Sequence, residues 1–253
     1  MELNYKSFGQ GDPIIILHGL FGTLDNWQTI AKQLAEDYMV YIIDLRNHGK
    51  SPHAAPMTYP QMAEDIQQFL ENNWIYEANI IGHSMGGKVA MQLALSYPDL
   101  VKNLIVVDIA PKQYPGGHYE IFDALFALDL TKVEGRNEAD NFLKERIKDF
   151  GVRQFLLKNL SRNKEGGYRW KMNLAVIYDH YQDILAPIQS EEPFEKPTLF
   201  IRGGQSDYIQ ADDLDTITEL FPVAIVDTVL DAGHWVHAQA PEELMSMVYA
   251  HFG

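Results

Sequence analysis

Six short apolar runs recur along the chain, and each is bounded by glycine, proline or aspartate. Runs this short, without alternating polar residues, are typical of parallel strands whose two faces are both covered. Stretches with helical spacing separate them, so the sequence predicts an α/β fold with a doubly wound, mostly parallel sheet. The predicted strands are Ile14–Leu17, Val40–Ile43, Asn79–Ile81, Leu104–Val107, Thr198–Ile201 and Ala224–Val229.

Five segments between or after these strands have the apolar spacing of helices. The last one opens on Pro241, Glu242 and Glu243. Proline lacks only an N–H that the first helical turn leaves unpaired, and acidic side chains favour the positive end of the helix dipole. The predicted helices cover residues 26–36, 59–72, 85–97, 212–221 and 241–251.

The alternation of strands and helices stops between Pro111 and Pro197. This stretch holds amphipathic helical patterns over residues 119–128, 138–160 and 168–185, and it has no strand pattern. A chain of 253 residues is long enough for one α/β domain with an insertion. We therefore predict a helical cap at residues 111–196, inserted before the penultimate strand of a core formed by residues 1–110 and 197–253.

Charge and the lack of cysteine exclude several classes of function. Lys plus Arg number 20 against 35 for Asp plus Glu, and the net charge of -15 disfavours binding to nucleic acids or anionic membranes. Without cysteine there is no disulfide, thiolate nucleophile or thiolate metal site. The N-terminus has no signal-peptide pattern, and no apolar run reaches the about 18 residues of a membrane span. We expect a cytoplasmic protein with no membrane span.

The motif with the clearest chemistry is Gly82-His83-Ser84-Met85-Gly86, at the predicted end of a strand and start of a helix. A serine in this sharp turn is raised above the sheet edge, and glycines on both sides avoid Cβ clashes with the neighbouring backbone. Ser84 is therefore the predicted nucleophile. The alternative is a purely structural, glycine-rich turn in which the serine caps the helix.

A serine needs a base, and His234 is the predicted one because it follows the last strand, at the same sheet edge as Ser84. His237 is the rival and is expected to cap or pack against the last helix. A zinc site formed by this His-x-x-His pair lacks a third ligand of suitable spacing, so no metal site is predicted. His83, beside the serine, is interpreted as structural, with its side chain turned away from the nucleophile.

The base needs a carboxylate that orients it, and two aspartates qualify. Asp108 ends the strand at 104–107, and Asp207 follows the strand at 198–201. Both are expected at the carboxyl edge of the sheet, and the residues alone do not rank their distances to His234.

An oxyanion requires two converging N–H donors. Leu20, in His18-Gly19-Leu20-Phe21-Gly22 after the first predicted strand, and Met85, at the start of a helix, are the predicted donors. Phe21 and Trp235 are the predicted substrate-binding residues. Further aromatic candidates for an acyl pocket, which helical spacing more often places in a core, are Tyr114, Phe122, Phe126, Tyr178 and Tyr181.

Together these motifs resemble the α/β-hydrolase superfamily from about Gly11 to the C-terminus, including the chain order serine, aspartate, histidine. The segments Asp44-Leu45-Arg46-Asn47-His48-Gly49, Val107-Asp108-Ile109-Ala110-Pro111 and Gly233-His234-Trp235-Val236-His237 look like the YbfF-type esterase branch. That resemblance implies a capped hydrolase of short to medium acyl esters, with acyl-CoA thioesters as a second substrate class. In that branch the acid stands where Asp108 does, whereas most of the superfamily has it at the position of Asp207.

Other functions fit part of the pattern. Dehalogenases and epoxide hydrolases need an aspartate at the position of Ser84, whereas a carbon–carbon bond hydrolase, a haloperoxidase or a lyase would keep the same residues. A ligand-binding receptor on a hydrolase scaffold belongs to another class, and the complete set of candidate residues argues against it. No cofactor is expected. The expected partner is a small acyl ester or thioester, and the expected assembly is a monomer or homodimer.

Overall fold

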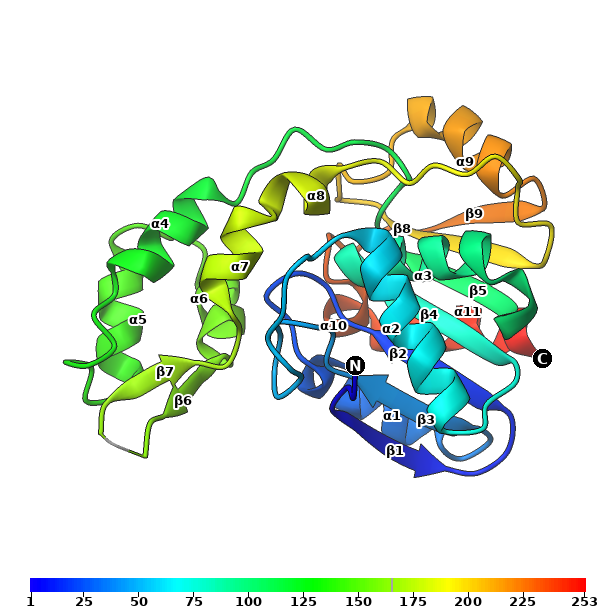
Figure 1. Cartoon of the computed structure of the whole chain (residues 1–253). Coiled ribbons are helices and arrows are strands. Elements are labelled where there is room, and N and C mark those ends of the chain that lie inside the picture. The colour runs from blue at the N-terminus through cyan, green and yellow to red at the C-terminus, as the bar shows by residue number, and fades with distance from the viewer. Residues whose placement is uncertain (165) are drawn as a thin grey trace.

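A computed structural model of the chain describes residues 1–164 and 166–253. Its main sheet has seven strands in the order β1-β3-β2-β4-β5-β8-β9 (Figure 1). Strand β1 runs antiparallel to β3, and the other five pairings are parallel. The predicted α/β class with a mostly parallel sheet is therefore confirmed. The strands are β1 (Tyr5–Gly9), β2 (Pro13–Leu17), β3 (Met39–Ile43), β4 (Ala78–His83), β5 (Val101–Val107), β8 (Thr198–Gly203) and β9 (Ala224–Val229).

Both faces of the sheet are covered by helices, which explains the continuous apolar runs. In β5, Leu104 and Val106 belong to a core shared with α2 and α3, whereas Ile105 and Val107 belong to a second core shared with α1 and α11. Successive side chains of a strand point to opposite faces, so each face needs its own apolar set. The core helices are α1 (Gln28–Leu34), α2 (Tyr59–Asn72), α3 (Met85–Ser96), α9 (Leu214–Leu220), α10 (Val236–Gln239) and α11 (Pro241–Phe252).

The two edge strands depart from the continuous apolar pattern. Strand β1, with the sequence Tyr-Lys-Ser-Phe-Gly, is largely exposed and was absent from the sequence prediction. Strand β9 was predicted with its observed bounds, but its side chains alternate between partly buried and exposed, and Ile225 is 63% exposed. An edge strand has one neighbour and a less covered surface, so its sequence need not be apolar throughout.

Residues 111–196, called the cap below, lie beside one end of the sheet (Figure 1). The expectation of a purely helical segment is wrong, because β6 and β7 form an antiparallel hairpin. The helix expected over 138–160 is two helices. The second of these is started by Asp149, whose carboxylate accepts a hydrogen bond from Val152 N–H at 2.8 Å. The cap elements are α4 (Tyr119–Ala127), α5 (Arg136–Lys144), α6 (Phe150–Leu157), β6 (Leu160–Arg162), β7 (Tyr168–Trp170), α7 (Leu174–Asp179) and α8 (Tyr181–Leu185).

The two linkers between core and cap pair with each other. Tyr114 N–H donates to the Leu185 carbonyl at 3.0 Å, and Ile188 N–H donates to the Pro111 carbonyl at 2.8 Å. These bonds fix where the cap leaves and rejoins the core, next to the carboxyl ends of β5 and β8. Among the described helices, none combines the length and the apolar content needed to cross a bilayer.

Candidate active site

Ser84 lies in a strained turn between β4 and α3. Its φ angle is 53°, a left-handed conformation that a serine adopts only where its surroundings hold it there. A Cβ on Gly82 would lie 2.3 Å from the Gly86 carbonyl oxygen, and one on Gly86 would lie 2.5 Å from the carbonyl oxygens of Leu17 and His18. These contacts supply the steric reason for both glycines of the motif. Ser84 is 9% exposed and lines the two cavities described below.

His234 is bonded to Asp108. The distance between His234 Nδ1 and Asp108 Oδ2 is 2.8 Å. Asp108 is fully buried, and its carboxylate also accepts hydrogen bonds from Gly203 N–H at 2.9 Å and from Ser206 Oγ at 2.5 Å. A carboxylate accepts from the Nδ1–H of a neutral imidazole, which leaves Nε2 of His234 with the free lone pair that a base requires.

Asp207, the second candidate acid, points elsewhere. It is exposed, and its Oδ1 accepts a hydrogen bond from Gln210 Nε2 at 3.3 Å. The structure therefore brings Asp108 and not Asp207 into contact with His234. The loop after β8 takes part through its neighbouring residues, because Ser206 binds Asp108 and the ring of Tyr208 stacks on His234 at 3.9 Å between centroids.

The other histidines near the site have separate contacts. His83 Nε2 donates to the His234 carbonyl at 2.8 Å and so helps to hold the loop that carries His234. His237 stacks on Trp27 at 4.5 Å between ring centroids, and burial lowers the pKa of its imidazole to about 3. No group of three acidic or histidine side chains within residues 1–164 and 166–253 is arranged to hold a metal ion.

The loop with Leu20 and Phe21 is held from two sides. Phe21 has a φ angle of 59°, its N–H donates to His48 Nε2 at 3.2 Å, and its carbonyl accepts from Asn159 Nδ2 at 2.6 Å. Burial lowers the pKa of His48 to about 3, so the ring is neutral and its Nε2 can accept. Asn159 belongs to the cap, so core and cap jointly fix the backbone next to Leu20.

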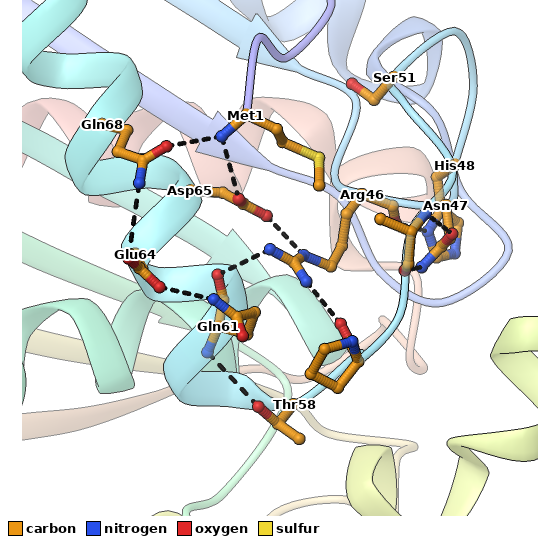
Figure 2. Close-up of polar contacts among 12 residues, drawn as sticks. Met1, Arg46, Asn47, His48, Ser51, Thr58, Gln61, Glu64, Asp65 and Gln68 are labelled. Carbon is orange, nitrogen blue, oxygen red and sulfur yellow. Dashed lines mark hydrogen bonds and ion pairs between the residues drawn. The ribbon is translucent and has the colours of Figure 1, made fainter.

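His48 is itself fixed by the loop after β3, which Figure 2 shows. The buried guanidinium of Arg46 forms an ion pair with Asp65 (Nε to Oδ2, 2.5 Å) and donates to the carbonyls of Pro56 and Gln61. The Arg46 carbonyl accepts from His48 Nδ1 at 3.0 Å. Because Arg46 is buried and paired, it offers no free positive charge to an anionic substrate.

Two cavities meet at Ser84. The first, of about 290 Å³, includes His234 in its lining, and we call it the His234 cavity. The second, of about 450 Å³, includes Met85, and we call it the Met85 cavity. The predicted oxyanion donor Leu20 lines both, whereas the predicted substrate-binding residues Phe21 and Trp235 line the His234 cavity.

The aromatic candidates of the cap are divided among cavity, core and surface. Tyr114 and Tyr181 line the Met85 cavity. Phe122 is fully buried and packs edge-on against neighbouring rings, whereas Phe126 and Tyr178 are 50% and 42% exposed. These three residues line neither cavity, so among the five candidates only Tyr114 and Tyr181 are placed where they could contact a ligand in these cavities.

A buried lysine connects the nucleophile helix to both linkers. Lys88, one turn after Ser84 in α3, donates from Nζ to the carbonyls of Lys112 at 2.7 Å and Ala186 at 2.6 Å. Its ammonium lies 4.9 Å from the centroid of the Tyr114 ring. Burial and the nearby Lys112 charge lower the pKa of Lys88 to about 7. Its hydrogen bonds to the two linker carbonyls direct the Nζ protons of Lys88 into the protein and away from a ligand.

Three residues of this arrangement are not predicted from the sequence as part of the site, namely Ser206, Tyr208 and Asn159. Ser206 and Tyr208 flank Asp207, so the loop was identified correctly while the contacts within it were not. Asn159 lies in a turn of the cap and has no motif that would reveal its bond to the Phe21 carbonyl.

Comparison with known proteins decides the family. The sequence model of the family described as the alpha/beta hydrolase fold matches residues 12–241. The chain belongs to the α/β-hydrolase family. The match spans both parts of the core as well as the cap between them.

Individual relatives of this α/β hydrolase are similar over nearly the whole chain. An sn-1-specific diacylglycerol lipase from Danio rerio is 41% identical over 98% of this chain and 81% of its own length. The esterase YbfF from Escherichia coli strain K12 is 37% identical over 93% of this chain and 91% of its own. A solved structure named as a marine microorganism esterase superposes with a TM-score of 0.97 at 43% identity, covering 99% of both chains. The resemblance to the YbfF-type branch is therefore confirmed.

Proposed function

We propose that this α/β hydrolase cleaves carboxylic esters through a triad of Ser84, His234 and Asp108. His234 Nε2 takes the proton of Ser84 Oγ while that oxygen attacks the ester carbonyl carbon. The tetrahedral oxyanion is bound by the N–H groups of Leu20 and Met85. The same imidazole then protonates the leaving alcohol, and a water molecule attacks the acyl-enzyme by the reverse sequence.

The observation that carries this proposal is the contact of 2.8 Å between His234 Nδ1 and Oδ2 of the buried Asp108, because His234 lines the same cavity as Ser84. A carboxylate at this nitrogen fixes the tautomer and stabilises the imidazolium that forms during attack. The esterases and lipases among the relatives support the same reaction class.

Oxygen esters fit the site better than CoA thioesters. Both classes would form the same acyl-enzyme, but a CoA group carries several negative charges. The cations Arg46 and Lys88 are buried and bonded within the protein, and the chain has a net charge of -15. Electrostatic attraction for a polyanion is therefore weak. A cytoplasmic location and a monomeric or dimeric state stay predictions from the sequence.

Three variants test the triad with p-nitrophenyl butyrate as substrate. Ser84→Ala abolishes turnover and labelling by a fluorophosphonate. Asp108→Asn lowers kcat by about 10³- to 10⁴-fold because an asparagine cannot stabilise the imidazolium. The matched control Asp207→Asn changes kcat by less than about threefold, since Asp207 does not contact His234. A larger loss in Asp207→Asn than in Asp108→Asn would contradict this choice of acid.

A further inference from the structure

Ser84 lies where two cavities meet. The two cavities differ in which other residues of the proposed active site line them. Both cavities are lined by Ser84, Leu20 and Tyr208. His234 lines only the smaller cavity, of about 290 Å³, and Met85 lines only the larger one, of about 450 Å³. The two sides of the nucleophile are therefore chemically distinct.

We propose that the Met85 cavity holds the acyl chain of the ester and that the His234 cavity holds its alcohol. This assignment rests on the proposed function. In the tetrahedral intermediate the former carbonyl carbon bears the serine oxygen, the oxyanion, the leaving oxygen and the acyl chain. The leaving oxygen must lie within hydrogen-bond reach of His234 to receive its proton. The alcohol then extends into the cavity that His234 lines, and the acyl chain takes the other.

The Met85 cavity offers a ligand mainly apolar surface, because most of its polar side chains are already bonded within the protein. The Tyr59 hydroxyl donates to the Ile184 carbonyl at 2.6 Å, and the Tyr114 hydroxyl donates to the Tyr208 carbonyl at 2.6 Å. The Lys88 ammonium is directed to the two linker carbonyls. The lining also includes Lys112, whose ammonium is paired with Asp213 at 2.6 Å, and the carboxylate of Asp207. An anionic acyl group would therefore find no unpaired cation here, would be repelled by Asp207 and would lose its hydration. The structure thus favours hydrocarbon acyl chains over dicarboxylic half-esters.

The two cavities also differ in which part of the molecule forms their walls. The wall of the His234 cavity includes Val152, Phe155 and Leu156 of α6, together with Trp235. The lining of the Met85 cavity includes Ile109 of the core and Ile184 and Leu185, which lie next to the returning linker. Selectivity for the alcohol therefore depends on α6, and selectivity for the acyl chain depends on the linker side.

Two phenylalanine substitutions separate these roles. Leu185→Phe narrows the Met85 cavity and Val152→Phe narrows the His234 cavity. Acyl length is probed by the ratio of kcat/KM for p-nitrophenyl octanoate to that for p-nitrophenyl acetate. Alcohol length is probed by the ratio for octyl acetate to that for ethyl acetate. Each ratio is measured within one protein sample, so a partly unfolded variant does not distort it.

The acyl ratio is expected to fall about tenfold in Leu185→Phe, and the alcohol ratio about tenfold in Val152→Phe. The control Val223→Phe introduces the same side chain at a site that is 51% exposed and outside both cavities, and it is expected to move neither ratio. In the wild type, the mono-p-nitrophenyl ester of succinic acid is expected to react about 100-fold more slowly than the butyrate ester.

The assignment would be overturned if Leu185→Phe lowered the alcohol ratio and Val152→Phe lowered the acyl ratio. It would also be overturned if either variant lowered both ratios equally. Fast cleavage of the succinate ester would overturn the hydrocarbon preference. Hydrolysis of any of these esters by the wild type tests the proposed function, whereas the direction of the ratios tests the assignment of the cavities. The two can therefore fail separately.

Discussion

Phe21 is held in a left-handed backbone conformation by one side chain from the core and one from the cap. His48 accepts from its N–H, and Asn159 donates to its carbonyl. The N–H of the preceding residue, Leu20, is the proposed oxyanion donor. Since a donor contributes only when it is directed at the developing charge, residues that fix this loop should act on kcat more than on KM.

Asn159→Leu tests this coupling. The change removes the donor to the Phe21 carbonyl with little change in volume, and kcat for p-nitrophenyl butyrate is expected to fall about tenfold, equivalent to about 1.4 kcal/mol, with KM nearly unchanged. Asn73→Leu is the matched control, because Asn73 Nδ2 also donates to a backbone carbonyl, that of Phe69, at 2.8 Å. If both variants lose stability and neither loses kcat, the role of Asn159 is purely structural.

The two candidate acids, Asp108 and Asp207, show what a residue pattern leaves undecided. Asp108 directly follows β5, whereas Asp207 lies four residues beyond the end of β8. Both positions are at the carboxyl edge of the sheet, as predicted. Which carboxylate meets His234 depends on how the loop after β8 turns, and that turn directs Ser206 inward and Asp207 to the surface. Loop conformation of this kind has no periodic signal.

Among elements, those of the core were predicted more accurately than those of the cap. The helix over 59–72 and the strand over 224–229 have their predicted bounds, and the central strands differ by a few residues at their ends. The cap was predicted less well, because its helices are short and their boundaries are set by caps such as Asp149 and Asn173. Its three-residue strands are too short for an alternation to be visible.

The turn from β4 to α3 yields a prediction about packing. A Cβ on Gly86 would lie 2.5 Å from the carbonyl oxygens of Leu17 and His18, and backbone of a central strand cannot move aside cheaply. Gly86→Ala is therefore expected to lower the free energy of unfolding by about 3 kcal/mol, measured by urea denaturation. The control is Gly135→Ala, where a Cβ would have no neighbour within 4 Å, and it should change that energy by less than about 1 kcal/mol. Equal effects of the two variants would refute the steric argument.

The molecule as a whole gathers its candidate residues because carboxyl ends of parallel strands meet at one edge of the sheet. This rule predicts from the sequence alone that the loops with Leu20, Ser84, Asp108 and His234 lie together. The division of the site into two cavities was not predictable in this way. It depends on where the cap returns to the core, and that position is set by contacts such as those of Lys88, between residues far apart in the sequence.

The fold also keeps several histidines neutral by burying them, and this should make it labile in acid. Burial lowers the pKa of His18 and His118 to about 4 and that of His48 and His237 to about 3, and it lowers the pKa of His83 strongly. Unfolding exposes these rings, which then bind protons below about pH 6.5. Above that pH these histidines do not lower the free energy of unfolding. As the pH drops from about 6.5 towards about 4, each of them lowers the free energy of unfolding by about 1.4 kcal/mol per pH unit.

His237→Phe isolates one of these groups. A phenylalanine can keep the stacking on Trp27, and His237 Nδ1 has no hydrogen-bond partner among the described residues, so the change removes little besides the titration. Between pH 7.5 and 5.0, the loss of unfolding free energy in urea should be about 2 kcal/mol smaller in the variant than in the wild type. The exposed His53 supplies the control, and His53→Gln should alter that loss by less than about 0.5 kcal/mol. If the free energy of unfolding of His237→Phe depends on pH as that of the wild type does, the imidazole of His237 has the same pKa in the folded and the unfolded chain. That result would contradict burial as the origin of acid lability.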